Sequence, residues 1–519
     1  LKEIIGYRQM DVFETESISV PSFYTKVGYQ TLFLPKMRQV VEQASADEWV
    51  LEESKQEGQA NTKADLVSLE KAIYDLYVAD YSAAWDDFLD QLAIANTTSF
   101  DHLISLVKST SGRDGAIYRV LSYVHDNTDY YSIPTAVNAA GMVEGAAAIA
   151  PPGLALSANK ATRGLKGVDR YLEKGIDSIH PMSAVTKHFK RLNSVINNSE
   201  GQSSAMQEVD KQLVMLEDYL SELDSSSHDS GNMTSVFDAT VKRVKGSRKD
   251  AISQFNRTSR LMPEPLNRWV SSLSGQTWGH MVSRTKRLVG DAYQDEIVEF
   301  YREHLNKKYP LDSRSEEDLL IDRFSEFFKP EGREQSFFNQ YIKPFVRTNN
   351  KRWTEKAVDG LSLGFKRDYL TQLQRADDIR KAMFNKRHEA FAELQLQPVY
   401  LDANISRFDL NLMGERLSYR HGPQKISKIS WPPMLNEDDI AMRFEDYNGN
   451  LVTEEMSGDW SLFRLIERYG KETSPNGLRY RMSFEVDGQR AVYNASGRTL
   501  SPALLGMLSK YRVPLKPLS

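Results

Sequence analysis

Few residues in this sequence have the types and spacing that could do chemistry. A phosphate-binding loop needs Gly-x-x-x-x-Gly-Lys followed by Ser or Thr, so that backbone amides hold the phosphate and the hydroxyl holds magnesium. The nearest segment is Gly470-Lys471, but Leu465 stands where the first glycine belongs and Glu472 replaces the hydroxyl. We therefore interpret this segment as a surface turn.

Metal and acid–base sites find little support either. The chain has nine histidines and no cysteine, and it contains no His-Glu-x-x-His motif for zinc. His180 and His188 lie eight residues apart, but Pro181 interrupts any helix that would carry both, and no third ligand is evident. Acidic runs such as 316–318 and 438–439 usually face solvent, and a catalytic carboxylate pair is recognisable only in the fold. We predict no catalytic residue, no cofactor and no metal.

Composition argues against one class of partner and gives some support to an oxidising compartment. The 519 residues are 40% hydrophobic and 26% charged, and the net charge of −5 argues against binding nucleic acid over a whole surface. The lack of cysteine is mild support for the periplasm.

No membrane-spanning segment is expected within the chain. The most apolar stretch, residues 133–158, is interrupted by Glu144, Pro151 and Pro152, so we interpret it as soluble packing or a loop. The chain opens without an initiator methionine or a signal peptide. We expect any membrane anchor to lie upstream of Leu1.

The first three quarters of the sequence predict helices, because apolar residues recur every three or four positions. One such stripe comprises Leu69, Ile73, Leu76, Tyr77, Tyr81, Ala84, Phe88 and Leu92. A second comprises Met206, Val209, Leu213, Leu216, Leu220 and Leu223, and a third runs from Leu370 to Met383. The second stripe is heptad-like but short, which favours a bundle helix over an independent coiled coil.

After about Pro398 the apolar period changes from 3.6 to 2, which predicts strands. The alternating residues include Phe408, Leu410, Leu412, Leu417, Tyr419, Ile440, Met442, Phe444, Leu478, Tyr480, Met482 and Phe484. Asp487-Gly488 then predicts a hairpin turn. The fold class is therefore α+β and multidomain, with a large N-terminal all-α region and a small C-terminal antiparallel β-sandwich.

We predict four parts: a helical domain over residues 1–245, a second helical domain over 246–395, a β-sandwich docking domain over 396–505 and a C-terminal tail over 506–519. The chain has no acidic residue after Asp487, whereas it has five basic ones there. This basic end could contact an anionic partner, and a solvated terminus is an equally good interpretation.

Several segments, in order along the chain, resemble the C-terminal periplasmic region of the IcmF/TssM family of type VI secretion proteins. The first half carries Tyr24-Thr25-Lys26-Val27-Gly28-Tyr29, Trp49-Val50-Leu51, and Leu76-Tyr77-Val78-Ala79-Asp80-Tyr81 with Trp85. The second half carries residues 323–332, Gln374-Arg375-Ala376-Asp377-Asp378-Ile379-Arg380, Tyr419-Arg420-His421-Gly422-Pro423, Trp431-Pro432 and Trp460-Ser461-Leu462-Phe463-Arg464-Leu465.

The resemblance implies a periplasmic scaffold of an inner-membrane protein, which is not an enzyme. It implies binding to the outer-membrane lipoprotein TssJ, a complex with inner-membrane TssL, and self-assembly around the trans-envelope channel. We expect TssJ contact chiefly in residues 396–519, whose deletion should leave the helical part folded. The alternatives are a periplasmic cell-wall hydrolase with carboxylate catalysis and a cytosolic helical adaptor.

Partner-binding residues are expected where the sandwich presents turns and aromatic side chains. The candidates are His421, Gly422, Pro423, Trp431, Asn448, Gly449 and Trp460. For Trp460, with Phe463 and Leu465, packing in the core is the stronger interpretation. Core packing is also expected for Phe324, Phe327 and Phe328, which share one helical face.

Overall fold

The computed structural model describes residues 1–14, 18–52, 62–130, 181–196, 205–225, 234–246, 250–349, 352–433, 439–472, 479–497 and 499–519. The apolar stretch 133–158, His180, Asp438, Leu478 and Arg498 lie outside these ranges. None of the helices in the described ranges combines the length and the apolar content needed to cross a membrane.

The chain divides into two compact units. Unit 1 comprises Leu1–Ser235 and Arg248–His280, and unit 2 comprises Val236–Ser247 and Met281–Ser519. Helices α13 (Thr234–Val244) and α15 (Leu266–Tyr293) contribute residues to both units. The finer division into four parts stays a prediction.

Unit 1 consists of helices. They are α1 (Lys2–Ile5), α2 (Lys26–Gly28), α3 (Leu34–Glu52), α4 (Thr62–Gln91), α5 (Phe100–Thr110), α6 (Ala116–Thr128), α10 (Ser183–His188), α11 (Lys190–Ile196), α12 (Ala205–Ser225) and α14 (Ala251–Ser259). Three short turns add η1 (Tyr7–Val12), η2 (Ser22–Tyr24) and η3 (Tyr29–Phe33). The six predicted stripe residues of α12 are all buried, as a bundle helix requires.

Helix α4 packs through an aromatic face. Tyr77, Tyr81 and Trp85 are buried, and their polar atoms bond to backbone carbonyls, as when the Trp85 Nε1 donates to Tyr24 O over 2.8 Å. Leu69 and Leu76 of the predicted stripe are exposed, which corrects that expectation. The buried side of the helix is the one that carries the rings, because these have the larger apolar area to remove from water.

The helical part of unit 2 continues from α15 through η5 (Gln294–Val298), η6 (Tyr301–Leu305), α16 (Ile321–Phe328), α17 (Arg333–Phe337), η7 (Phe338–Ile342), η8 (Lys343–Phe345) and α18 (Arg367–Met383). A two-stranded ribbon, β1 (Val346–Arg347) and β2 (Thr354–Glu355), lies between η8 and α18. Phe324, Phe327 and Phe328 are fully buried, which confirms the prediction of a shared core face.

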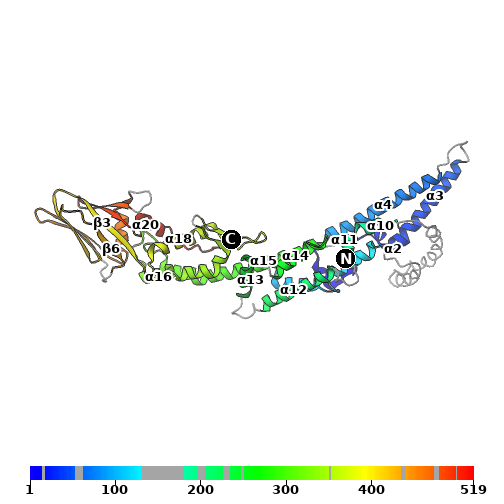
Figure 1. The fold of residues 1–519 in the computed structure, drawn as a ribbon, viewed down its shortest axis with the longest axis horizontal. Coiled ribbons are helices and arrows are strands. Elements are labelled where there is room, and N and C mark those ends of the chain that lie inside the picture. The colour runs from blue at the N-terminus through cyan, green and yellow to red at the C-terminus, as the bar shows by residue number, and fades with distance from the viewer. Residues whose placement is uncertain are drawn as a thin grey trace. The chain divides into compact units, whose positions relative to one another are not determined.

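The remainder of unit 2 is an antiparallel β-sandwich, which confirms the predicted fold class (Figure 1). Its strands are β3 (Ala392–Leu401), β4 (Ile405–Leu412), β5 (Glu415–Tyr419), β6 (Ser427–Trp431), β7 (Ile440–Asp446), β8 (Leu451–Met456), β9 (Gly470–Glu472), β10 (Arg479–Val486) and β11 (Gln489–Ser496). One sheet has the order β6-β3-β11-β10-β9 and the other β5-β4-β7-β8. Helices α19 (Ser461–Tyr469) and α20 (Pro502–Leu508) accompany them.

The predicted hairpin turn is present between β10 and β11. Asp487 and Gly488 have φ angles of 48° and 78°, and Val486 faces Gln489 across the turn. Two successive positive φ angles match the twist of the flanking strands, which is why Asp-Gly is favoured at such turns.

Candidate functional site

The strand registers place the predicted contact residues at two opposite ends of the sandwich. Strand β4 begins at Ile405 beside Asp446 and ends at Leu412 beside Ile440, so all turns next to Ile405 share one end. We call this the outer end, which comprises residues 402–404, 420–426, 447–450 and 487–488. The inner end comprises residues 431–433, 457–460 and 497–501.

Five of the seven candidates lie at the outer end. Three of them, His421, Gly422 and Pro423, follow β5 and are exposed, and the His421 ring nitrogen Nε2 lies 2.8 Å from Ile405 O. In the turn between β7 and β8, the Asn448 amide donates to Asp446 Oδ1 over 2.8 Å, and Gly449 has a φ of 87°. Hydrogen bonds within the outer end therefore hold the backbone of both turns, while their side chains face solvent. Whether these residues contact a partner stays a prediction.

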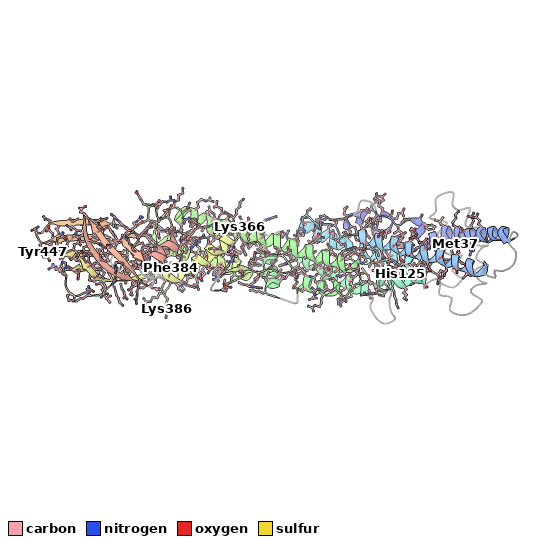
Figure 2. All side chains as sticks on the ribbon, turned by 90° about the horizontal axis from the view of Figure 1, so that it is seen from above. Met37, His125, Lys366, Phe384, Lys386 and Tyr447 are labelled. Atoms are coloured by element: carbon pink, nitrogen blue, oxygen red, sulfur yellow. The ribbon has the colours of Figure 1, made fainter. Side chains whose placement is uncertain are left out.

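The outer end also exposes apolar side chains that the sequence reasoning missed. Tyr447 is 68% exposed and Leu451 is 61% exposed, and Figure 2 labels Tyr447 at the extremity of the sandwich. The sequence does contain a signal for the exposure of Tyr447. The large apolar residues of β7 alternate at even positions up to Phe444, whereas Tyr447 occupies an odd position and so does not continue the buried face. Exposed aromatic side chains are the type that most often anchors a protein interface.

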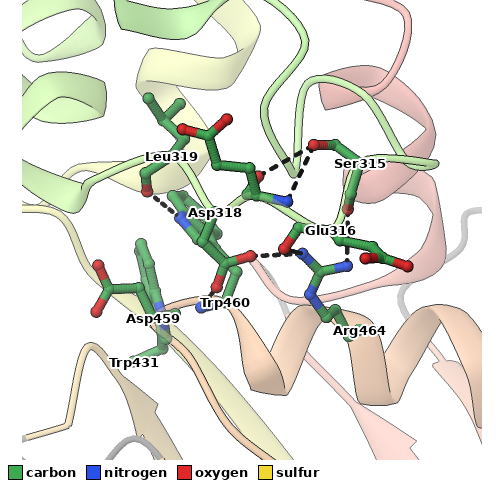
Figure 3. Close-up of polar contacts among 9 residues, drawn as sticks. Ser315, Glu316, Asp318, Leu319, Trp431, Asp459, Trp460 and Arg464 are labelled. Atoms are coloured by element: carbon green, nitrogen blue, oxygen red, sulfur yellow. Dashed lines mark hydrogen bonds and ion pairs between the residues drawn. The ribbon is translucent and has the colours of Figure 1, made fainter.

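Trp431 and Trp460 lie instead at the inner end, where both are fully buried (Figure 3). Trp431 donates through Nε1 to Asp459 O over 2.8 Å, and the two indole rings are 4.6 Å apart. Burial confirms core packing for Trp460, Phe463 and Leu465. For both tryptophans the structure assigns a packing role, so the prediction of surface contact stays with the five outer residues.

Asp318 and Arg464 join the inner end to the segment that precedes α16. The Arg464 guanidinium lies 2.5 Å from Asp318 Oδ1 and donates to Ser315 O over 3.1 Å (Figure 3). It also covers the Tyr309 ring, with 3.9 Å between the guanidinium carbon and the ring centroid. The Trp460 Nε1 adds a bond to Leu319 O. The acidic run 316–318 was expected to face solvent, and Asp318 corrects this, because its carboxylate pairs with a cation of α19.

The acid with the most perturbed environment is Glu334 on α17. It is 4% exposed and forms an ion pair with Arg380, which also lies 3.2 Å from Asp377. Burial raises the pKa of Glu334 to about 7. Tyr511 and Pro514 line a small cavity that Glu334 also lines. A raised pKa suits a general acid, but this carboxyl lies beneath other side chains rather than in an open cleft.

Two other kinds of chemical site, a metal site and a hydrolase nucleophile, can be checked against the structure. Within the ranges given above, no group of three or more His, Asp or Glu side chains could hold a metal ion. Residues 360–364, Gly-Leu-Ser-Leu-Gly, match the spacing of a hydrolase nucleophile elbow, which the search for motifs overlooked. Ser362 lies in an irregular segment between β2 and α18, whereas an elbow needs a sharp turn directly from strand to helix.

Three family models match the chain. The IcmF-related model, described as intracellular multiplication and human macrophage-killing, matches residues 1–129. The model of the type VI secretion protein IcmF helical domain matches residues 285–389. The model of the type VI secretion protein IcmF C2-like domain matches residues 394–499, which contain the sandwich strands and both ends described above.

A curated relative and two solved structures are similar to the chain. The type VI secretion system component TssM1 of Pseudomonas aeruginosa is 26% identical over 475 residues, which are 90% of this chain and 41% of that protein. The chain thus spans about two fifths of its relative's length. A structure titled type VI secretion system membrane core complex has a TM-score of 0.69 at 13% identity and covers 100% of this chain and 94% of its own. Another, titled type VI membrane complex, has a TM-score of 0.60 at 14% identity and covers 87% and 80%. At these identities the two structures establish a shared fold.

Proposed function

Because this chain belongs to the IcmF/TssM family of type VI secretion proteins, we propose that it is a periplasmic structural scaffold of the type VI secretion membrane complex. In this role it binds the outer-membrane lipoprotein TssJ, works with inner-membrane TssL and self-assembles around the trans-envelope channel. The TssM1 relative, which matches over 90% of this chain, supports the assignment to the complex.

The outer end of the sandwich is the proposed TssJ contact. Tyr447 and Leu451 are the supporting observation, since both large apolar side chains are exposed, one in the turn after β7 and the other at the start of β8. The hairpin itself is held by Asp446, so its backbone loses little conformational freedom when a partner covers it.

Binding of purified TssJ to the whole chain, measured by biolayer interferometry, tests this assignment. We expect the double variant Tyr447→Ala, Leu451→Ala to bind about tenfold more weakly or worse, because loss of an interface anchor costs roughly 1.4 kcal/mol or more. Leu261→Ala is the matched control, since Leu261 is 81% exposed in unit 1. Equal affinity of all three proteins would exclude the outer end as the TssJ site.

A cell-wall hydrolase remains the second candidate, and its best acid is Glu334. The curated relative is a type VI secretion system component, and the two similar structures belong to type VI membrane complexes, which suggests a role without catalysis. Incubation of the chain with purified peptidoglycan should therefore release no soluble fragments at pH 5 to 8. Release that Glu334→Gln abolishes would favour the hydrolase instead.

The periplasmic location can be tested apart from binding. We expect alkaline phosphatase fused after Ser519 of the full-length parent protein to be active in cells, because that enzyme needs the disulfides that form only in an oxidising compartment. An inactive but intact fusion would favour the cytosolic adaptor.

A further inference from the structure

The predicted C-terminal tail (506–519) begins inside α20, and its last eleven residues, 509–519, return from the sandwich to the helical part of unit 2. From here on we call residues 509–519 the tail. Polar groups of α15, η5 and the residue before α18 donate to tail carbonyls. Tyr293 Oη bonds to Pro514 O over 2.9 Å, Gln294 Nε2 to Leu515 O over 2.6 Å and the Lys366 amide to Pro517 O over 2.9 Å. The tail is thus docked, rather than solvated as the sequence equally allowed.

The docked tail covers Glu334. Tyr511 is 3% exposed, and together with Arg512, Val513 and Pro514 it closes the cavity in which Glu334 lies. Glu334 would be open to water on this side without these four residues. The tail therefore determines how much water reaches one particular carboxyl group.

Most elements around Glu334 contribute charged or titratable groups. Helix α18 contributes Arg380, Asp377 and Tyr369, α15 contributes Tyr293, η6 contributes Tyr301, and the tail contributes Tyr511 and Arg512. Helix α16 contributes only the Phe328 carbonyl, which accepts from Arg380 Nε over 3.1 Å.

The balance of these groups disfavours a carboxylate at this position. Arg380 is shared between Glu334 and Asp377, and Asp377 pairs in addition with Lys381 over 2.5 Å. The Tyr369 Oη, also in the cavity wall, is buried without a hydrogen-bond partner. A charged Glu334 beneath the tail is therefore poorly solvated, and buried charges without full compensation are costly.

We propose that the tail is a proton-linked latch, which is held most firmly while Glu334 carries a proton and is released more readily once that carboxyl ionises. Release lets water reach Glu334, and hydration stabilises the carboxylate far more than the neutral acid. Docking and proton binding therefore favour each other.

The direction of the pH effect follows from this linkage. With the tail docked, the pKa of Glu334 is raised to about 7, whereas a hydrated glutamate titrates near 4.5. Between these values the docked state retains a proton that the released state has lost. Docking is thus strongest in acid and weakens by up to about tenfold for each pH unit across this window. Above about pH 7 both states are ionised, and the dependence flattens.

Hydrogen–deuterium exchange of the whole chain tests the latch, with rates corrected for the intrinsic effect of pH. The reporters are the Lys366 amide, bonded to Pro517 O, and the Arg512 amide, bonded to the Gln372 side chain over 3.0 Å. We expect peptides containing them to exchange at least tenfold faster at pH 7.5 than at pH 5, while peptides of the β10–β11 hairpin stay unchanged. Corrected rates that do not vary with pH would overturn the proposal.

Three variants separate the latch from a general loss of stability. Glu334→Gln is permanently neutral, so the tail should stay protected at both pH values. Glu299→Gln, at an exposed position of the same helical region, should behave as the unmodified chain. Tyr293→Phe removes one tail bond and leaves the Glu334 carboxyl in place, so exchange should rise equally at both pH values. A pH dependence that persists in Glu334→Gln, or that vanishes in Tyr293→Phe, would contradict the latch.

Discussion

The Asp318 carboxylate bonds both to a cation of α19 and to the backbone of the residue before that helix. Oδ1 meets Arg464, and Oδ2 accepts from the Trp460 amide over 3.4 Å. We predict that Asp318→Asn lowers the free energy of unfolding of unit 2 by about 1–2 kcal/mol, because a charge-assisted bond becomes a neutral one. Urea unfolding followed by tryptophan fluorescence measures this. Glu316→Gln is the control, since only the Glu316 carbonyl meets Arg464.

Gly458 stands against the same carboxylate. Its φ is 111°, and an added Cβ would lie 2.5 Å from Asp318 Oδ2. Gly458→Ala should therefore destabilise unit 2 by more than about 1 kcal/mol, through both the backbone conformation and the clash. Gly422→Ala, which meets open space at an ordinary φ, should change stability by less than about 0.5 kcal/mol. In an Asp318→Ala background the clash is gone, so a penalty that stays undiminished there would mean the contact is unimportant.

Single residues were predictable only where local chemistry decides their position. Asp487-Gly488 requires one turn geometry, and the structure has it. Trp431 and Trp460 could not be placed, since an aromatic residue suits both a core and an interface. The partnership of Asp318 with Arg464 joins positions 146 apart in the sequence, and no local pattern encodes it.

At the scale of elements, the turn between β7 and β8 depends on one side chain. Asp446 accepts from the amides of Asn448 and Asn450 and from the Asn450 side chain. Those bonds lower the pKa of Asp446, so their support is complete above the ordinary carboxyl pKa of 3.8 and is lost as the pH falls through the lowered value.

The corresponding prediction is made at neutral pH, where the rest of the protein is stable. Asp446→Ala should speed amide exchange at Asn448 and Asn450, measured by NMR or mass spectrometry. The turn at Asp487-Gly488 should keep its exchange rate, because its geometry comes from backbone conformation. Unchanged exchange at Asn450 would show that the turn holds without the carboxylate.

The spacing of apolar residues predicted whether most elements are helices or strands. It failed where tertiary packing decides which face of a helix is buried. The stripe of α12 is buried throughout, whereas α4 turns Leu69 and Leu76 outward and buries its rings. The tail has no periodic signal at all, because side chains distant in sequence dock it through its carbonyls.

For the whole molecule, the structure changes what truncation at residue 395 should do. Trp460 packs on Phe324 with ring centroids 5.2 Å apart, and Tyr511 packs on Phe328 at 5.0 Å. Deleting residues 396–519 removes these contacts, so the prediction that the helical part stays folded can be tested most directly in residues 281–395. We predict that limited proteolysis of the truncated chain spares much of unit 1 and digests residues 281–395. A protease-resistant fragment reaching residue 395 would contradict this.

The strand registers have a mechanical consequence. The chain enters the sandwich at Ala392 and leaves it at Ser496, both at the inner end, while the strands run lengthwise to the outer end. A partner bound at the outer end would pull against the rest of the chain, which is attached at the inner end. The resulting force acts parallel to the strands. A force in this direction loads all the hydrogen bonds between neighbouring strands at the same time. A force perpendicular to the strands would break them one after another, so the sandwich should resist the parallel force far better.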